Sequence, residues 1–178
     1  MNIFIILLIC YFTVIPPGEE RILADKTARK KIDKTVAAII QSESYTFQPL
    51  KLPLDSIFAN ENPVKPGSFF QIVSEKSIKG LLYVGSAKGR YDWFDFIVVF
   101  NPELVIEKVE IIVYREDHGV EIMNKSWLAQ FKGVTGCDLE YGKDIDAVSG
   151  ATLSAGSLTK AVKEVCWELV DNGYHAGK

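Results

Sequence analysis

The sequence is poor in the residues and motifs that mark many metal and nucleotide sites. It contains two histidines and three cysteines among 178 residues, and no CxxC or HExxH pattern occurs, so we expect no metal site. No GxGxxG fingerprint occurs either, which leaves no candidate dinucleotide site. The net charge of -3 at pH 7 provides no excess of Lys and Arg to meet phosphates. We therefore expect no nucleic-acid partner.

The three cysteines are too widely spaced to predict a disulfide framework. Cys10 lies in an apolar leader, Cys137 in an expected loop, and Cys166 on the expected buried face of the last helix. A disulfide between Cys137 and Cys166 is possible in an oxidising compartment. We prefer the interpretation of Cys166 as a buried, unreactive thiol.

The chain opens with an apolar leader, MNIFIILLICYFTVIPPGEE. Its apolar run, residues 3–15, ends at Pro16-Pro17-Gly18 and is shorter than the ~20 residues that a helix needs to cross a bilayer. The run resembles the apolar region of an export signal, although a basic start and an A-x-A cleavage site are missing. We interpret residues 1–17 as an export signal or short membrane anchor, with a buried core segment as the alternative.

An N-terminal helix is predicted within residues 18–44, from residue 19 to about residue 42. Its apolar side chains recur at roughly helical spacing: Ile22, Ile32, Val36, Ile39 and Ile40. Its basic residues are expected to form a solvated face: Lys26, Arg29, Lys30, Lys31 and Lys34. The positive-inside rule would keep such residues in the cytoplasm, so the membrane orientation stays open.

The middle of the chain predicts a linker followed by four strands. Residues 45–66 are rich in Pro, Asn and Asp and are interpreted as extended linker and loop. The strands are expected at residues 68–75, 80–87, 93–100 and 109–116, where β-branched and aromatic residues gather between turn-like breaks. Short breaks between consecutive strands favour an antiparallel meander. The aromatic residues Trp93, Phe94 and Phe96 are expected to fill strand faces.

Two further helices complete an α+β fold. A short helix is expected at residues 124–133, where Trp127 and Phe131 share one face. The last helix is predicted at residues 152–171, with Asn172-Gly173 as its stop. Its apolar stripe is Leu158, Val162, Val165 and Leu169. The predicted fold is an antiparallel sheet with flanking helices, closed by an amphipathic helix that follows a Ser-Gly-Ala-Thr turn.

That turn, in the stretch DIDAVSGATLSAGSLTKAV (residues 144–162), has two interpretations. Ser, Thr and Gly are typical of a helix start, where hydroxyl groups cap free N–H groups and glycine lets the chain turn. Alternatively, the turn presents Thr152 for covalent modification.

Residues 146–152 resemble the flavinylation motif of the bacterial FMN-binding domain family, D-x-x-[ST]-G-A-[ST]. This family includes the periplasmic FMN-bearing subunits of the Rnf and Na⁺-translocating NADH:quinone oxidoreductase complexes. Upstream segments agree in order: Tyr91 after a glycine-containing turn, residues 116–119 in place of the family's Glu-Thr-Pro-Gly, and residues 127–133 for its W..QF.G segment. The resemblance covers roughly residues 80–172. The chain departs from the family at Asp117-His118, which leaves the shape of that loop open, and at Ala155, where a second hydroxyl residue is common. Its leader is also shorter than the family's membrane helix.

The resemblance implies FMN joined through its phosphate to the hydroxyl of Thr152 by a separate flavin transferase, which uses FAD and a divalent metal. A threonine hydroxyl is a poor nucleophile without a base, which is consistent with an enzyme acting in trans. Gly150 and Ala151 keep the loop slim, and the start of the last helix favours a phosphate. Asp146 is either read by the transferase or stiffens the turn.

Around Thr152, the expected cofactor-binding residues are Ser149, Gly150, Ala151, Asp146, Glu116, Gly119 and Trp127. Glu116, Gly119 and Trp127 could line the pocket of the flavin ring or be purely structural. His118 could bond a flavin carbonyl, although a surface loop position is preferred. No catalytic residue is expected.

The function that follows is a cell-envelope electron-transfer flavoprotein, exported to the periplasm or the outer face of the cytoplasmic membrane. Its FMN-binding domain spans residues 45–178 and relays electrons between membrane redox subunits rather than acting as a complete enzyme. One alternative is an envelope binding or accessory protein whose Ser-Gly-Ala-Thr turn is an unmodified cap. Another is a reductase of a small substrate with noncovalent FMN.

Overall fold

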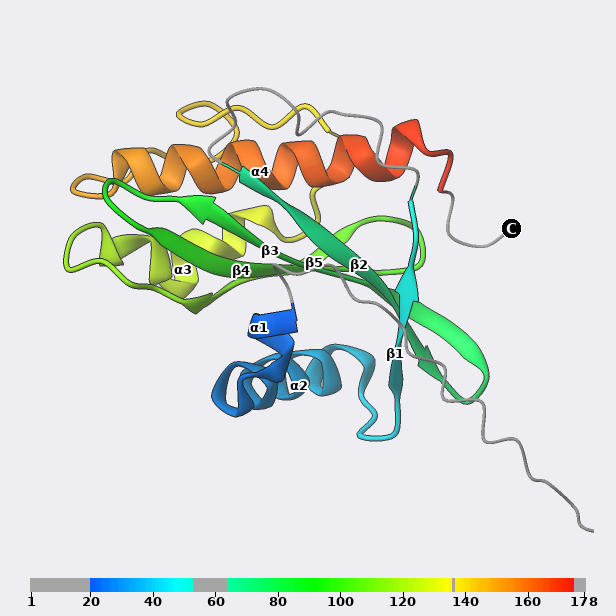
Figure 1. Ribbon diagram of the computed structural model, residues 1–178. Coiled ribbons are helices and arrows are strands. Elements are labelled where there is room, and N and C mark those ends of the chain that lie inside the picture. Colours follow the sequence, from blue (N-terminus) through cyan, green and yellow to red (C-terminus); the bar gives the residue numbers. More distant parts are fainter. Residues whose placement is uncertain (1–19, 53–63, 136, 175–178) are drawn as a thin grey trace, which may run out of the picture.

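The computed structural model describes residues 20–52, 64–135 and 137–174, and these form three layers. A five-stranded sheet lies between α2 on one face and α4 with α3 on the other (Figure 1). The helices are α1 (Glu20–Ala24), α2 (Lys26–Ile40), α3 (Lys125–Leu128) and α4 (Thr152–Asp171), with 3₁₀ turns η1 (Val120–Met123) and η2 (Ala129–Phe131). The strands are β1 (Thr46–Leu50), β2 (Val64–Ser74), β3 (Ser77–Lys88), β4 (Trp93–Phe100) and β5 (Ile106–Val113).

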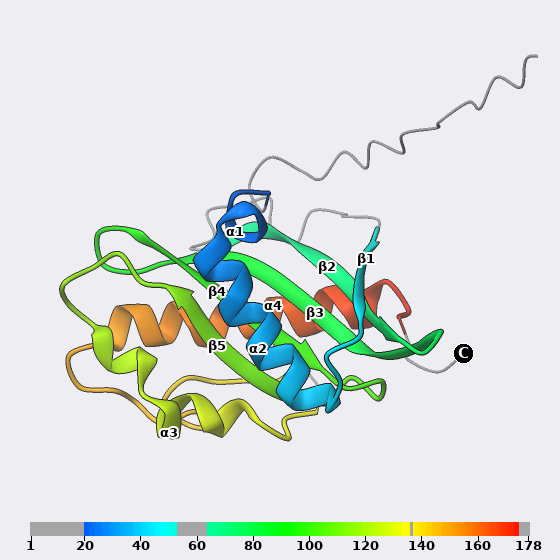
Figure 2. The same ribbon diagram turned by 90° about the horizontal axis from the view of Figure 1, so that it is seen from below.

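The sheet is an antiparallel meander with strand order β1-β2-β3-β4-β5. The predicted α+β class and meander are therefore confirmed. In the view of Figure 2, from below, α2 lies in front of the sheet and crosses its strands obliquely. Each neighbour in the sheet is also a neighbour in sequence, so no long crossover connection interrupts the sheet.

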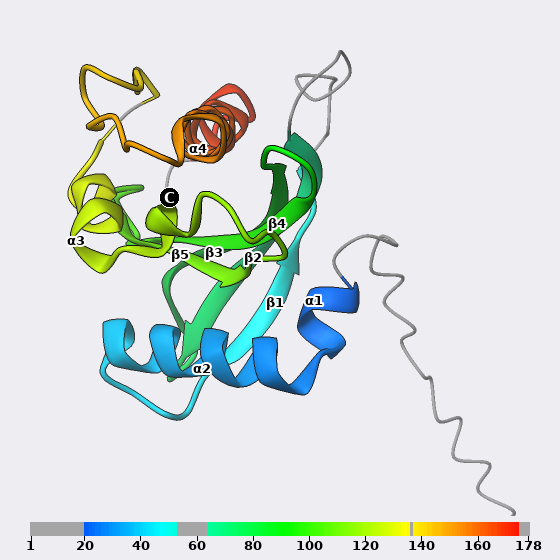
Figure 3. The same cartoon turned by 90° about the vertical axis from the view of Figure 1, so that its left-hand side faces the viewer.

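Two apolar cores, one on each face, hold the layers together. On β4, Phe94, Phe96 and Val98 belong to the core beneath α4, whereas Ile97 and Val99 belong to the core above α2. This alternation is the period-two pattern of a strand, and β4 is buried on both faces because helices cover both. The end-on view of Figure 3 shows α4 and α2 on opposite sides of the sheet.

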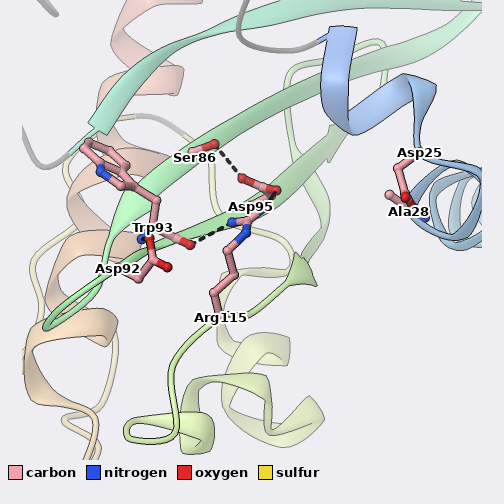
Figure 4. Close-up of polar contacts among 7 residues, drawn as sticks. All are labelled: Asp25, Ala28, Ser86, Asp92, Trp93, Asp95 and Arg115. Atoms are coloured by element: carbon pink, nitrogen blue, oxygen red, sulfur yellow. Dashed lines mark hydrogen bonds and ion pairs between the residues drawn. The ribbon is translucent and has the colours of Figure 1, made fainter.

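The predicted N-terminal helix is two helices, which corrects the expectation of one continuous helix. The break falls at Asp25, whose Oδ1 accepts hydrogen bonds from the N–H groups of Thr27 (2.9 Å) and Ala28 (2.7 Å). This N-cap starts α2 afresh, and Figure 4 shows Asp25 directed at Ala28. The predicted apolar face is confirmed for Ile32 and Val36, both fully buried against the sheet.

The predicted strand boundaries need three corrections. Residues 46–50, interpreted as linker, form edge strand β1. The hairpin between β2 and β3 turns at Glu75 and Lys76, whose φ angles of 51° and 61° are those of a two-residue turn that normally takes Asn-Gly. Strand β5 begins at Ile106 and ends at Val113, so Glu116 lies beyond the strand in the following loop.

The last two helical predictions are confirmed in the main. Trp127 and Phe131 are buried and pack edge to face, with ring centroids 5.6 Å apart. The helix α4 spans Thr152–Asp171 as predicted, with Leu158, Val162, Val165 and Leu169 buried along its inner face. Gly173 follows with a φ of 64°, the left-handed conformation expected of a helix stop.

Cys137 and Cys166 are both buried and free, in the core beneath α4. Burial raises the pKa of Cys166 from 9.0 to about 12 and also raises the pKa of Cys137. Since the thiolate is the reactive form, Cys166 in the native protein should react with iodoacetamide about 10³-fold more slowly at pH 8 than an ordinary thiol. Peptide mass spectrometry before and after unfolding in urea tests this, and equal native and unfolded rates would contradict it.

No helix in the three described ranges is both long and apolar enough to cross a membrane. The interpretation of residues 1–17 as a signal or anchor concerns a segment outside those ranges.

Candidate functional site

Three segments meet at one end of the molecule, which we call the Thr152 end: residues 89–92 between β3 and β4, residues 114–124 after β5, and residues 149–154 at the start of α4. The distances around Gly89, in the first segment, show how close the other two segments lie. A Cβ built there would lie 2.2 Å from Oε1 of Glu116 and 3.2 Å from Oγ of Ser154. The three segments therefore touch, and they form the left-hand end of the molecule in Figure 1.

Glu116 joins two of these segments. Its Oε1 accepts hydrogen bonds from the backbone N–H groups of Tyr91 (2.9 Å) and Asp92 (2.8 Å). Its Oε2 is buried and has no hydrogen-bond partner among the described residues. A buried oxygen without a donor is costly and rare in native proteins. The carboxylate thus fixes the turn between β3 and β4 and keeps one buried acceptor unsatisfied.

Tyr114 joins the loop after β5 to α4. Its hydroxyl donates to the carbonyl of His118 (2.6 Å), so its single proton is committed there. The contact with Ser154 at 3.1 Å therefore has the serine hydroxyl as donor. Burial raises the pKa of Tyr114, and the carboxylates of Glu116 and Glu121 raise it further, against the opposing effect of the Ser154 bond. The phenol is protonated at neutral pH.

Three side chains hold the backbone that leads into the motif. The indole Nε1 of Trp127 donates to the carbonyl of Asp146 (2.8 Å), and the N–H of Asp146 donates to Oε1 of Gln130 (2.9 Å). The N–H of Val148 donates to the hydroxyl of Tyr141 (2.9 Å). The carboxylate side chain of Asp146 points outward and is exposed. These three hydrogen bonds therefore hold the backbone of residues 146–148, which leads into the turn.

The turn itself is exposed except at Ala151. The N–H of Ala151 donates to the carbonyl of Val148 (3.3 Å), and Gly150 adopts a φ of 84°, which glycine reaches without strain. Ser149 is exposed, Ala151 is buried, and Thr152 is exposed again. The hydroxyl of Thr152 makes one long hydrogen bond, 3.4 Å, to the carbonyl of Val148. This hydroxyl is open to solvent and weakly engaged.

The start of α4 has no side-chain cap, which corrects the interpretation of the turn as a hydroxyl cap. Its N-cap residue is Ala151, and no side chain accepts a hydrogen bond from the first turn of the helix. Thr152 is the first helical residue and does not cap the helix. The first N–H groups of a 20-residue helix, with the positive end of its dipole, therefore remain available to an anion.

Exposed apolar side chains gather at the Thr152 end. Seven large apolar side chains are exposed in the described part of the chain, and four of them belong to the Thr152 end: Tyr91, Val120, Met123 and Leu153. Leu153 is 61% exposed and Tyr91 is 64% exposed. A separate open groove of about 830 Å³ runs along α2 and the residues that follow it, 41–45. Among the described residues, no group of three His, Cys, Asp or Glu side chains could hold a metal ion.

The predicted site residues fall into two groups. Glu116, Gly119 and the Ser-Gly-Ala-Thr turn come together at the Thr152 end, where a Cβ on Gly119 would lie 3.7 Å from the Cα of Ala151. Trp127 and Asp146 form the second group: the indole N–H of Trp127 donates to the carbonyl of Asp146, and the ring of Trp127 is buried. His118 is exposed, as preferred from the sequence.

Four residues of the site were missed. Tyr114 and Ser154 bridge the loop and the helix, Gly89 leaves space for Glu116, and Glu121 lies against Gly150. A Cβ on Gly150 would be 3.3 Å from Oε1 of Glu121. Strand alternation would not have indicated Tyr114, because Tyr114 packs against the core beneath α4 whereas Ile112, two residues before it, belongs to the core above α2. No sequence signal pairs Tyr114 with Ser154.

The packing at Gly119 gives a matched test of the site's geometry. Gly119 has a φ of 78°, and a Cβ there would lie 2.6 Å from the hydroxyl of Tyr114. Gly133 has a φ of 83° with nothing within 4 Å. We expect Gly133→Ala to lower the free energy of unfolding by about 1 kcal/mol, the cost of the left-handed backbone. Gly119→Ala should cost about 2–3 kcal/mol, because the clash adds to it. Urea unfolding measures both, and equal losses would show that Tyr114 moves aside freely.

The comparisons with known proteins agree with this geometry. Residues 89–166 match the model of the family described as FMN-binding domain, a segment that contains all three parts of the Thr152 end. This segment belongs to the FMN-binding domain family. The predicted recognition is thereby confirmed for residues 89–166.

The fold of this FMN-binding domain also occurs in a solved structure. The crystal structure of Shewanella oneidensis NqrC superposes with a TM-score of 0.55 at 16% sequence identity. The match covers 76% of this chain and 90% of that chain. At this identity the likeness establishes a shared fold. No curated protein matches the sequence significantly.

Proposed function

We propose that the protein is an electron-transfer flavoprotein of the bacterial cell envelope, with FMN joined by a phosphodiester to Thr152. The observation that carries the proposal is the position of the Thr152 hydroxyl, exposed at the uncapped start of α4 within a segment that matches the FMN-binding domain family. A hydroxyl in that position is accessible to another enzyme, and a phosphate attached to it would lie at the positive end of the helix.

The residues present fit FMN in three respects. The uncapped N–H groups of α4 suit the phosphate, and the unpartnered Oε2 of Glu116 suits a ribityl hydroxyl or a ring N–H. The apolar side chains of Tyr91, Leu153 and their neighbours in η1 suit the flat, largely apolar ring system. Small side chains let the phosphate and the ring come close to the backbone at four positions: Ser149, Gly150, Ala151 and Gly119.

Attachment requires a flavin transferase, because the chain offers Thr152 no base of its own. Within the described residues, the hydroxyl is bonded only to a carbonyl, which cannot take its proton at neutral pH. In the proposed reaction the threonine oxygen forms a bond to the FMN phosphorus of FAD. The pyrophosphate bond breaks, AMP leaves, and the proton passes to a base of the transferase. Asp146, exposed beside the turn, is a candidate recognition residue.

FMN, when bound, can accept and release electrons, and the protein's part is to place it at the surface. The Thr152 end is a platform of loops and exposed apolar side chains, which suits exchange with a docked partner. Membrane redox subunits are the partners that the resemblance implies, and residues 1–17 would direct the chain to the envelope. We retain residues 45–178 as the extent of the domain, with residues 18–44 as an N-terminal helical segment.

The test is co-expression with a flavin transferase, followed by intact mass and flavin fluorescence under denaturing conditions. Covalent FMN adds its mass to the chain and stays fluorescent on the unfolded protein. An unmodified mass in the presence of an active transferase would favour the accessory-protein alternative. Flavin that is lost on unfolding would favour the noncovalent alternative. Steady turnover of the isolated protein with a soluble donor and acceptor would favour a reductase over a relay.

A further inference from the structure

The outer face of α2 carries a stripe of lysines with no acidic residue among them. The exposed residues of this helix are Lys26, Thr27, Lys30, Lys34 and Ala38, of which three are lysines at positions i, i+4 and i+8. Residues at this spacing lie on one side of a helix. The opposite side, with Ile32 and Val36, is buried against the sheet.

The other two cations of α2 are engaged within the protein. Arg29 forms an ion pair with Asp33 at 3.0 Å, and Nζ of Lys31 donates to the carbonyl of Ile111 at 2.6 Å. In the part of the chain that the structure describes, the ammonium groups of the lysine stripe take part in no ion pair or hydrogen bond. The stripe is therefore free to meet an external anion.

The acidic groups near α2 do not lie within the stripe. Asp25 is engaged as the N-cap of the helix, and Asp33 is engaged with Arg29 and the hydroxyl of Tyr45. Glu43 is exposed beyond the end of the helix. The helix holds five basic residues and one acidic residue in a chain whose net charge is -3. The helix α2 thus carries a net positive charge in a protein whose overall charge is negative.

The neighbouring sequence indicates which anionic partner this face meets. The apolar run of residues 3–15 ends five residues before Glu20, where α1 begins. Five residues span at most about 18 Å. An apolar segment held in a bilayer would therefore keep α1 and α2 close to the lipid headgroups.

We propose that the lysine stripe Lys26-Lys30-Lys34 binds the protein to an anionic membrane surface through lipid phosphates. Each lysine near such a surface contributes about fivefold to binding, so the three together contribute roughly 10²-fold. Because α4 lies on the other face of the sheet, this orientation places α2 toward the lipid and α4 away from it (Figures 1 and 3). The inference is independent of the flavin.

Lysine acetylation of the full chain in lipid nanodiscs tests the proposal. We expect acetylation of Lys26, Lys30 and Lys34 to be at least about tenfold slower in discs of phosphatidylglycerol than in discs of phosphatidylcholine. Salt at 1 M, where the Debye length falls to about 3 Å, should remove this protection. The exposed lysines Lys125, Lys132 and Lys143, on elements of the α4 side, serve as internal controls and should react equally in both discs.

A variant that keeps one lysine as a reporter distinguishes the contribution of the lysine stripe to membrane binding from that of the leader. In Lys26→Gln/Lys34→Gln, Lys30 remains as the reporter, and its protection constant in anionic discs should fall by roughly 25-fold, about fivefold for each lost charge. Glutamine preserves helix propensity, so the fold should be retained. The matched control Lys125→Gln/Lys132→Gln should leave Lys30 protected. Equal acetylation in the two kinds of disc, or unchanged protection in the variant, would overturn the proposal. Both results are read by peptide mass and need no flavin, so failure here leaves the proposed function untouched.

Discussion

Thr152→Val is expected to yield a folded protein that carries no covalent FMN after co-expression with a flavin transferase. Valine keeps the branched shape of threonine and removes only the hydroxyl that would bond to phosphorus. The residue is exposed and its one hydrogen bond is long, so the free energy of unfolding should change by less than about 0.5 kcal/mol. Intact mass measures the loss of modification, and urea unfolding confirms that the fold is kept.

Two matched variants make this result specific to the hydroxyl at position 152. Thr152→Ser keeps an attacking oxygen and should still be modified. Ser149→Ala should also be modified, because it leaves the Thr152 hydroxyl in place. Ser149 is the alternative attachment site to test, since its hydroxyl is the nearest exposed one, whereas Ser154 is only 2% exposed. FMN on the valine variant would assign the attachment to another residue and contradict the proposal.

Arg115→Met should be the most destabilising of the single substitutions considered, because it strands a buried charge. The guanidinium of Arg115 pairs with Asp95, which is 2% exposed, and it also donates to the carbonyl of Trp93 (2.7 Å). Figure 4 shows these contacts together with Ser86, which donates to Asp95 at 2.7 Å. Removing one partner of a buried pair typically costs about 3–5 kcal/mol. Since Ser86 remains and Arg115 itself is partly exposed, we expect about 3 kcal/mol in urea unfolding.

Two controls separate the buried charge from the loss of a surface cation. Lys143→Met breaks an exposed ion pair with Glu140 and should cost less than about 0.5 kcal/mol. In Asp95→Leu/Arg115→Met both charges are gone, so much of the stability should return. A single variant as stable as the wild type would show that water solvates Asp95 once the arginine is removed.

The sequence predicts those parts of the fold where one local signal dominates. The apolar stripe and the Asn172-Gly173 stop predict α4 to the residue, and aromatic and β-branched runs predict β4 with equal accuracy. The failures have local causes. Asp25 resembles any polar helix residue until its side chain is seen to cap α2. The turn at Glu75-Lys76 lacks the glycine by which such turns are recognised.

The site was predictable where the residues are contiguous and not where they converge. The motif around Thr152 could be recognised because seven adjacent residues carry it. The bond between Tyr114 and Ser154 joins residues 40 apart in sequence, and its existence depends on the loop after β5 folding back to α4. Glu121 approaches Gly150 for the same reason. Neither contact can be predicted from the periodicity or the composition of the sequence.

Strand β1 limits how another protein can approach one edge of the sheet. It contributes only five residues to the margin of the sheet, and one of them, Pro49, has no N–H to offer a further strand. Another chain therefore cannot readily extend the sheet on that side by backbone pairing, which is also a common route to aggregation. On that side of the sheet, association must instead rely on contacts between side chains.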